Sequence, residues 1–135
     1  MIKRNLFKIV FLGTIAILFL LLGQSLLADE EYICAVYFTG VGCPHCANAD
    51  SVILEDLPRE YPNFVVIEYE IYQQRENAPL LYEYNENYNS GLGIPLIIFN
   101  KKDYMVGDRS ILSKTKPIIE KGSNKCPLID GSSTN

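Results

Sequence analysis

The chain of 135 residues contains no tryptophan, one histidine and only four cysteines, and no acidic residue precedes Asp29. All 16 acidic residues follow, against nine lysines and arginines in the same stretch. The net negative charge of this stretch argues against a nucleic acid or an anionic membrane surface as the partner of the protein. We find no internal repeat, and about a hundred residues after the first 28 suffice for one small domain.

The first 28 residues differ from the rest. Three cationic residues, at positions 3, 4 and 8, precede an apolar stretch over residues 9–22, and the small residue Ala28 follows. This order is typical of a secretory signal peptide, and residues 9–28 are also long enough to span a bilayer as an anchor. Both interpretations stay open. Because the cations lie before the apolar stretch, either one predicts an extracytoplasmic domain, secreted, periplasmic or anchored at the outer face of the cytoplasmic membrane.

The rest of the chain alternates strand and helix patterns. A strand is expected at 33–39 and a helix from Cys43 to Pro58, with Pro44 at its first position, where the missing N–H costs nothing. The other expected elements are strands at 64–71, 95–100 and 104–107 and helices at about 77–88 and 110–121.

This order predicts one α/β domain over residues 29–126. Strands that alternate with helices favour parallel pairing, and the short turn after residue 99 favours an antiparallel hairpin. The expected sheet is therefore mixed and four-stranded, with helices on both faces (β-α-β-α-β-β-α). Residues 127–135 are low in apolar content and predict a disordered tail.

The most informative motif is Cys43-Pro44-His45-Cys46. Thiol–disulfide exchange needs an accessible thiolate and a second thiol that resolves the mixed disulfide. At a helix N-terminus, unpaired N–H groups stabilise negative charge on Cys43, and a protonated His45 adds a positive charge. Cys46, within the first turn, is expected to be more buried and to act as the resolving thiol.

Other uses of the same two cysteines are weaker. A zinc site usually needs a second cysteine pair or added histidines at fixed spacing, and the sequence has neither. An inert structural disulfide is a further alternative, but a Cys-x-x-Cys between a strand and a helix favours redox chemistry. We therefore expect no bound metal.

A second marker is Gly93-Ile94-Pro95, directly before the third expected strand. A proline there can be a simple strand boundary. Antiparallel pairing, however, brings the start of the third strand beside the end of the first, and so predicts that Pro95 lies next to Cys43.

Over nearly all of residues 33–121, these features resemble the thioredoxin superfamily. The Cys-Pro-His-Cys tetrapeptide is similar to that of DsbA-type oxidants, and residues 91–96 are similar to the segment of thioredoxins that carries their cis-proline. The resemblance implies a cis Ile94–Pro95 bond and substrate binding by the backbone of Ile94. It also implies no cofactor other than a redox-active Cys43–Cys46 disulfide.

The chain departs from the pattern in several places. The large helical insertion of DsbA-type proteins is missing, and Val41 and Gly42 stand where thioredoxins carry a tryptophan before the first cysteine. Tyr37 replaces a buried aspartate that relays protons in thioredoxins. Glu55 is the candidate to take over this role.

Cys34 and Cys126 are expected to form a structural disulfide. The last helix would start at the end of the sheet that carries the dithiol and run away from it, so that its end lies near the start of the first strand. Closing so long a loop contributes roughly 4 kcal/mol in the chain-entropy model. A free or partner-directed thiol at Cys126 is the alternative.

Three functions stay open. The first is an enzyme that exchanges disulfides with protein thiols, with a membrane protein as its redox partner. The second is a dedicated reductase fed by a membrane thiol carrier, in which the same residues work in the opposite direction. The third is a binding module that holds copper through Cys43 and Cys46. The sequence sets no reduction potential and hence no direction.

Overall fold

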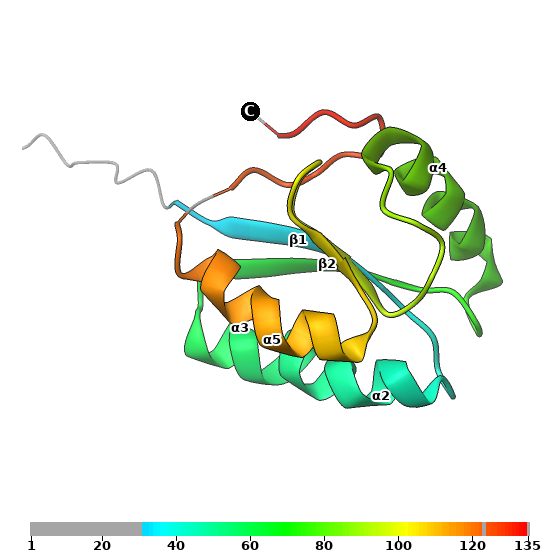
Figure 1. The fold of residues 1–135 in the computed structure, drawn as a ribbon, viewed down its shortest axis with the longest axis horizontal. Coiled ribbons are helices and arrows are strands. Elements are labelled where there is room, and N and C mark those ends of the chain that lie inside the picture. Colours follow the sequence, from blue (N-terminus) through cyan, green and yellow to red (C-terminus); the bar gives the residue numbers. More distant parts are fainter. Residues whose placement is uncertain (1–30, 123, 135) are drawn as a thin grey trace, which may run out of the picture.

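The computed structural model describes residues 31–122 and 124–134 (Figure 1). The N-terminal apolar segment, expected to be a signal peptide or an anchor, lies outside these residues. The strands are β1 (Ile33–Thr39), β2 (Phe64–Glu70), β3 (Leu96–Ile98) and β4 (Tyr104–Val106). The helices are α2 (Pro44–Ser51), the π-helical η1 (Val52–Asp56), α3 (Leu57–Glu60), the 3-10 turn η2 (Arg75–Asn77), α4 (Ala78–Tyr88) and α5 (Asp108–Ile119).

The four strands form one mixed sheet in the order β2-β1-β3-β4. β1 pairs with β2 in parallel and with β3 antiparallel, and β3 pairs antiparallel with β4. The prediction of a mixed four-stranded α/β sheet is therefore confirmed. All seven residues of β1 are buried, as its apolar, β-favouring sequence predicts for a central strand.

Helices cover both faces of this sheet (Figure 1). Alternate residues of β1 point to opposite faces. Ala35 and Tyr37 pack with α2, η1, α3 and α5 in one apolar cluster, whereas Val36 and Phe38 pack with α4 in another. The end of β1, which leads to α2, thus lies between the two helix layers that cover the faces of the sheet.

The expected helix end at Pro58 is wrong, because the helix continues to Glu60. Proline inside an α-helix clashes with the carbonyl four residues earlier and lacks the N–H to bond it. Here the five residues before Leu57 widen into the π-helical η1, whose bonds span five residues instead of four. This local widening accommodates Pro58 in the first turn of α3 without ending the helix.

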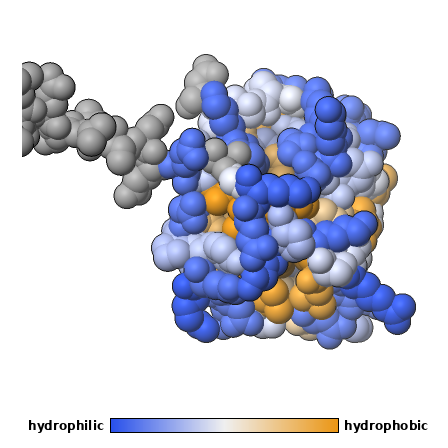
Figure 2. All heavy atoms as spheres, turned by 60° about the vertical axis from the view of Figure 1, so that its left-hand side comes forward, coloured by the Kyte–Doolittle hydropathy of each residue, from blue (hydrophilic) through white to orange (hydrophobic). Residues whose placement is uncertain are grey.

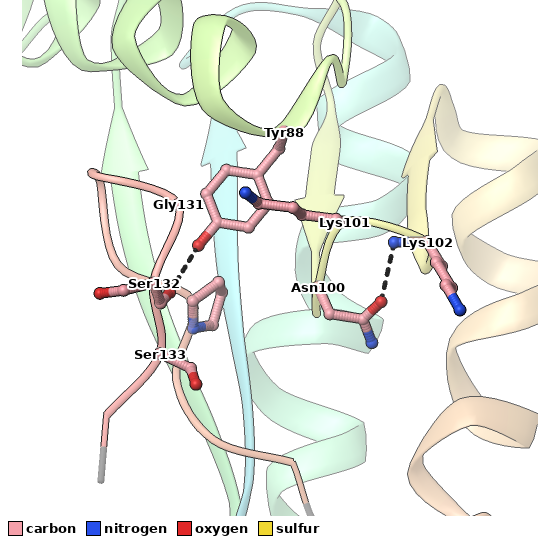
Figure 3. Close-up of a pocket in the computed structure, with 8 residues that line it drawn as sticks. Tyr88, Asn100, Lys101, Lys102, Gly131, Ser132 and Ser133 are labelled. Atoms are coloured by element: carbon pink, nitrogen blue, oxygen red, sulfur yellow. Dashed lines mark hydrogen bonds between the residues drawn. The ribbon is translucent and has the colours of Figure 1, made fainter.

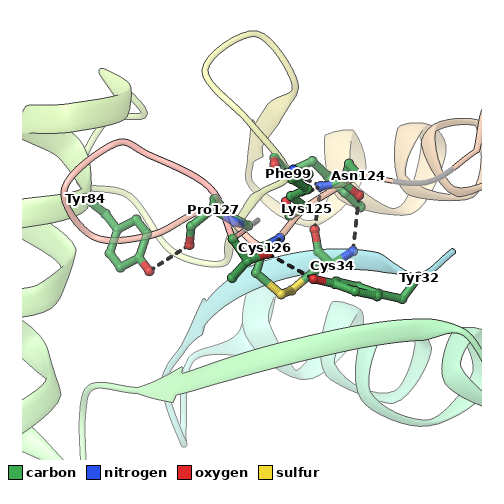
Figure 4. The surroundings of a disulfide bond; sticks show 9 residues. Tyr32, Cys34, Tyr84, Phe99, Asn124, Lys125, Cys126 and Pro127 are labelled. Atoms are coloured by element: carbon green, nitrogen blue, oxygen red, sulfur yellow. Dashed lines mark hydrogen bonds between the residues drawn. A yellow bond between two sulfur atoms is a disulfide. The ribbon is translucent and has the colours of Figure 1, made fainter. Parts of the chain in front are cut away.

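A disulfide joins Cys34 on β1 to Cys126, with the two Cα atoms 4.7 Å apart (Figure 4). This is the pairing favoured by the sequence. Next to it, the Asn124 side chain accepts a hydrogen bond from Cys34 N (3.1 Å) and donates to Cys34 O (2.8 Å) and Phe99 O (3.0 Å). Asn124 thus provides hydrogen bonds to backbone groups of Cys34 and Phe99 that lie beyond the end of the β1–β3 ladder. The C-terminal segment covers this end of the two strands.

Residues 127–134, expected from the sequence to be a disordered tail, form a turn against α4 in the structure. The Tyr84 hydroxyl donates to Pro127 O (3.1 Å), and the Tyr88 hydroxyl donates to Leu128 O (2.7 Å) and Ser132 O (2.9 Å). These partners lie some 40 residues away in the sequence, so the local composition of the tail gives no sign of them.

The face at the left of Figure 1 is brought forward in Figure 2 and is mostly hydrophilic, with apolar side chains surfacing only in small areas. Within the described part of the chain, no helix has both the length and the apolar character needed to cross a membrane.

Candidate active site

Cys43 and Cys46 lie at the start of α2, directly after the turn that follows β1. Cys43 is the N-cap residue, and its Sγ accepts a hydrogen bond from Cys46 N at 3.3 Å. Cys43 is partly exposed and Cys46 is fully buried, and both thiols are free. An accessible sulfur at a helix N-terminus with a buried sulfur one turn further is the arrangement that the sequence predicts.

The Cys46 thiol lies in a place that disfavours its charged form. Burial, followed by the hydrogen bond with Cys43, raises the pKa of Cys46 to about 12. Hydrogen bonding to the Thr39 side chain and to the backbone at Gly40 lowers the pKa of Cys46, but by less than burial raises it. With its pKa raised so far above neutrality, Cys46 is a thiol and not a thiolate at pH 7, so it needs a base in order to react.

Asp50 supplies a carboxylate next to Thr39. It lies on α2, one turn after Cys46, and its Oδ1 accepts hydrogen bonds from the Thr39 hydroxyl (2.7 Å) and the Tyr37 hydroxyl (2.8 Å). Burial and the contact with Asp50 raise the pKa of Tyr37. Cys46, Thr39 and Asp50 therefore form a continuous polar path through an otherwise apolar layer.

The sequence reasoning missed Asp50 and considered Glu55 instead. Glu55 lies on η1 and is exposed, whereas Asp50 is partly buried beside Tyr37. The spacing could have indicated it, because residues four apart on a helix share one face. A carboxylate four residues after the buried cysteine points to the same side of the helix as that cysteine.

Pro95 lies opposite the end of β1. Phe38 pairs with Leu96, so Pro95, which precedes Leu96, is close to Thr39 and the turn to Cys43. The Ile94–Pro95 bond is cis, and Pro95 is fully buried. Its carbonyl accepts a hydrogen bond from Gly107 N at 2.8 Å, and this bond ties the segment to the start of α5.

Ile94 lies over the turn between β1 and α2. A Cβ placed at Gly40 would be 2.9 Å from the Ile94 side chain and 2.8 Å from the Tyr72 ring, and one at Gly93 would be 2.9 Å from Val106. Only glycine leaves room for such close packing. We call Val41, Tyr72, Leu92, Ile94 and Val106 the apolar rim; all but the half-buried Ile94 are exposed, and they belong to the turn before the dithiol and the segments around Gly40 and Gly93.

His45 is exposed on the outer side of α2, and its Nδ1 lies 3.2 Å from Asp108 Oδ2 at the start of α5. The amide of Asn48 donates to the same carboxylate oxygen at 2.8 Å. Asn48 and then His45 lower the pKa of Asp108 to about 2. The sequence singled out His45 but gave no indication of its partner, which is 63 residues away.

Glu70 anchors the turn before the dithiol from the end of β2. Its Oε1 accepts from Val41 N (2.9 Å) and Tyr72 N (2.8 Å), and its Oε2 accepts from Gln73 N (2.8 Å) and Gln74 N (2.7 Å). Burial would raise the pKa of Glu70, but the four N–H donors outweigh it and lower the pKa to about 2. The ionised carboxylate thus connects the dithiol turn to the loop after β2.

Glu70→Gln should lower the unfolding temperature by several degrees at pH 7. The amide keeps one acceptor oxygen, but its NH₂ group faces two N–H donors and cannot bond them. The pKa of Glu70 is lower in the folded protein than in the unfolded chain. The stabilisation that Glu70 gives the folded state is therefore complete at pH values above the pKa of the unfolded chain, and it is lost as the pH falls toward 2. Thermal unfolding of both proteins from pH 7 to 2 should therefore show a shrinking difference.

Glu76→Gln is the matched control, since Glu76 is an exposed glutamate in η2, a few residues away. It should leave the unfolding temperature almost unchanged. An equal effect of the two substitutions, or a difference that stays constant down to pH 2, would contradict the role assigned to Glu70.

A pocket of about 310 Å³ lies at the other end of the sheet (Figure 3). It is lined by the turn after β3 and by the C-terminal turn: Tyr88, Asn100, Lys101, Lys102, Pro127, Gly131, Ser132 and Ser133. Because β1 and β3 are antiparallel, the turn after β3 is at the end where β1 begins, remote from Cys43. Among the described residues, no three His, Cys, Asp or Glu side chains gather as a metal-binding group.

No protein-family model matches the chain, and no curated protein matches it. A crystal structure of a protein from Agrobacterium tumefaciens is similar to it, with a TM-score of 0.50 and 22% sequence identity. The similarity covers 70% of this chain and 48% of that protein, so the matched part is about half of the longer protein. At this identity the likeness concerns the fold alone.

Proposed function

We propose that this protein is a thiol–disulfide oxidoreductase with a thioredoxin-like fold, which acts outside the cytoplasm through Cys43 and Cys46. The observation that carries the proposal is the pair itself: a partly exposed sulfur that caps a helix, 3.3 Å from the N–H of a fully buried second cysteine. The buried Pro95 opposite the end of β1 supports the same assignment.

In the proposed reaction, the Cys43–Cys46 disulfide oxidises a protein dithiol. A substrate thiolate attacks Cys43 Sγ, the bond between the two enzyme sulfurs breaks, and Cys46 leaves and takes up a proton. The second substrate thiol then attacks the mixed disulfide and releases Cys43 as a thiolate at the helix N-terminus. Two electrons pass from the substrate dithiol to the enzyme; one of the two substrate protons is taken up at Cys46, and the other passes to solvent because Cys43 stays a thiolate.

The reverse direction depends on Cys46. To close the enzyme disulfide, Cys46 must attack Cys43 in the mixed disulfide and lose its proton. In our proposal the proton passes to the Thr39 oxygen while the Thr39 hydroxyl proton passes to Asp50, along the hydrogen bond of 2.7 Å. The apolar rim is suited to contact apolar side chains of a protein substrate.

The location outside the cytoplasm is part of the proposal. A disulfide between Cys34 and Cys126 supports an oxidising compartment, where such bonds persist. The sequence pattern of residues 1–28, a signal or an anchor, agrees with it. A membrane protein that exchanges electrons with the Cys43–Cys46 pair is the redox partner that we propose.

The test is equilibration of the full-length chain, in mild detergent, with buffers of defined reduced and oxidised glutathione. Mass spectrometry after alkylation should show Cys43 and Cys46 passing together between dithiol and disulfide, while Cys34 and Cys126 stay paired. The midpoint decides the direction: a potential above that of the glutathione couple assigns an oxidant, and one below it a reductase. A Cys43–Cys46 pair that never exchanges with glutathione would overturn the proposal.

A further inference from the structure

The contact between His45 and Asp108 joins the tetrapeptide to a helix that is remote in sequence. The His45 side chain is 71% exposed, and so exposed a ring on a helix surface is ordinarily free to change rotamer. Here its Nδ1 faces Asp108 Oδ2 at 3.2 Å. The ring therefore has one preferred orientation, which α5 sets.

Asp108 is itself held in place. Its side chain is only 14% exposed, its Oδ2 accepts from the Asn48 amide (2.8 Å), and its Oδ1 accepts from Arg109 N (2.9 Å). Gly107, the residue before it, donates its N–H to Pro95 O. The carboxylate thus has a fixed position relative to both α2 and the segment that carries Pro95.

We propose that Asp108 is a positioning residue that holds the His45 ring in the first turn of α2, next to the dithiol in sequence, and thereby makes the Cys43–Cys46 disulfide a stronger oxidant. This inference rests on the proposed thiol–disulfide exchange. Reduction of the disulfide by two thiols of a substrate yields a dithiol in the enzyme and a disulfide in the substrate. A Cys43 thiolate exists only in the reduced enzyme, so a cation in the same helical turn favours reduction.

Asp108 acts on the dithiol in two ways of opposite sign. Through His45 it favours the Cys43 thiolate, and through its own negative charge it disfavours it. The first effect requires His45 and the second does not. A pair of substitutions therefore separates the two, because Asp108→Asn should lower the equilibrium constant for reduction when His45 is present and should not lower it when His45 is absent.

The experiment measures the equilibrium constant for reduction of the oxidised protein by glutathione at pH 7 in four full-length proteins: wild type, Asp108→Asn, His45→Ala and the double variant. Asp108→Asn should lower this constant about two- to fivefold when His45 is present, the range expected of an exposed charge pair. In the His45→Ala background the same substitution should leave the constant unchanged or raise it. Asp108→Glu should restore most of the wild-type value.

A purely structural role of Asp108 at the start of α5 predicts a different result. It would lower the unfolding temperature and change the equilibrium equally in both backgrounds, and that outcome would overturn the inference. The same holds if Asp108→Asn leaves the wild-type equilibrium unchanged. Failure of the wild type itself to equilibrate with glutathione would instead overturn the proposed function. His45→Ala, an exposed substitution, provides an independent arm and should also lower the constant.

Discussion

Cys43→Ser should reduce disulfide exchange to the rate of the uncatalysed reaction. The hydroxyl of serine has no role in thiol–disulfide exchange, and Cys46 alone is fully buried with a pKa raised to about 12. The substitution should preserve the fold, because Cys43 is the N-cap of α2 and serine is a preferred residue at that position. An unchanged unfolding temperature together with a complete loss of exchange would assign the loss to chemistry.

Cys46→Ser should keep the first attack on a substrate disulfide but fail to complete the exchange. Cys43 can still attack a substrate disulfide, but no second thiol resolves the product, so a mixed disulfide between Cys43 and the substrate should accumulate. Non-reducing electrophoresis after incubation with a disulfide-containing protein should show the adduct, and a reductant should release it. Equal residual turnover in Cys43→Ser and Cys46→Ser would contradict the assigned roles. So would a mixed disulfide formed through Cys46 in Cys43→Ser.

The parts of the fold that the sequence predicts are those with a local signal. β1 is an uninterrupted apolar run between polar and glycine residues, and its observed range equals the expected one. The end of α4 follows from Asn89, which takes the left-handed conformation that asparagine tolerates better than most residues. Alternation of strands and helices then suffices for the mixed sheet.

The parts that the sequence does not predict depend on contacts between distant segments. The π-helical widening before Pro58 cancels a helix-stop signal, and tyrosines on α4 order the C-terminal turn. In the site, the tetrapeptide and Pro95 have recognisable patterns. The partners of His45 and Val41, namely Asp108 and Glu70, come from the start of α5 and the end of β2, where ordinary acidic residues have no distinguishing pattern.

Asp50→Asn should slow the resolving step roughly 10²-fold, the lower range of general base catalysis. The amide of asparagine is no base at neutral pH, so the proton of Cys46 loses its destination beyond Thr39. The first attack by Cys43 needs no such base and should keep its rate. Rapid mixing with a disulfide substrate, followed by acid quenching, should therefore show a mixed disulfide that forms at the normal rate and decays slowly.

The two hydroxyls that bond Asp50 provide the control, because the proposed proton path from Cys46 runs through Thr39 and not through Tyr37. Thr39→Val keeps the size of the side chain and removes the bridge between Cys46 and Asp50, so it should reproduce the slow decay. Tyr37→Phe removes the other hydrogen bond and leaves the bridge intact, so its decay should stay near the wild-type rate. If Tyr37→Phe were as slow as Asp50→Asn while Thr39→Val decayed normally, the proton would not pass through Thr39. Asp56→Asn, on the same helical segment but exposed, should have no effect on either step.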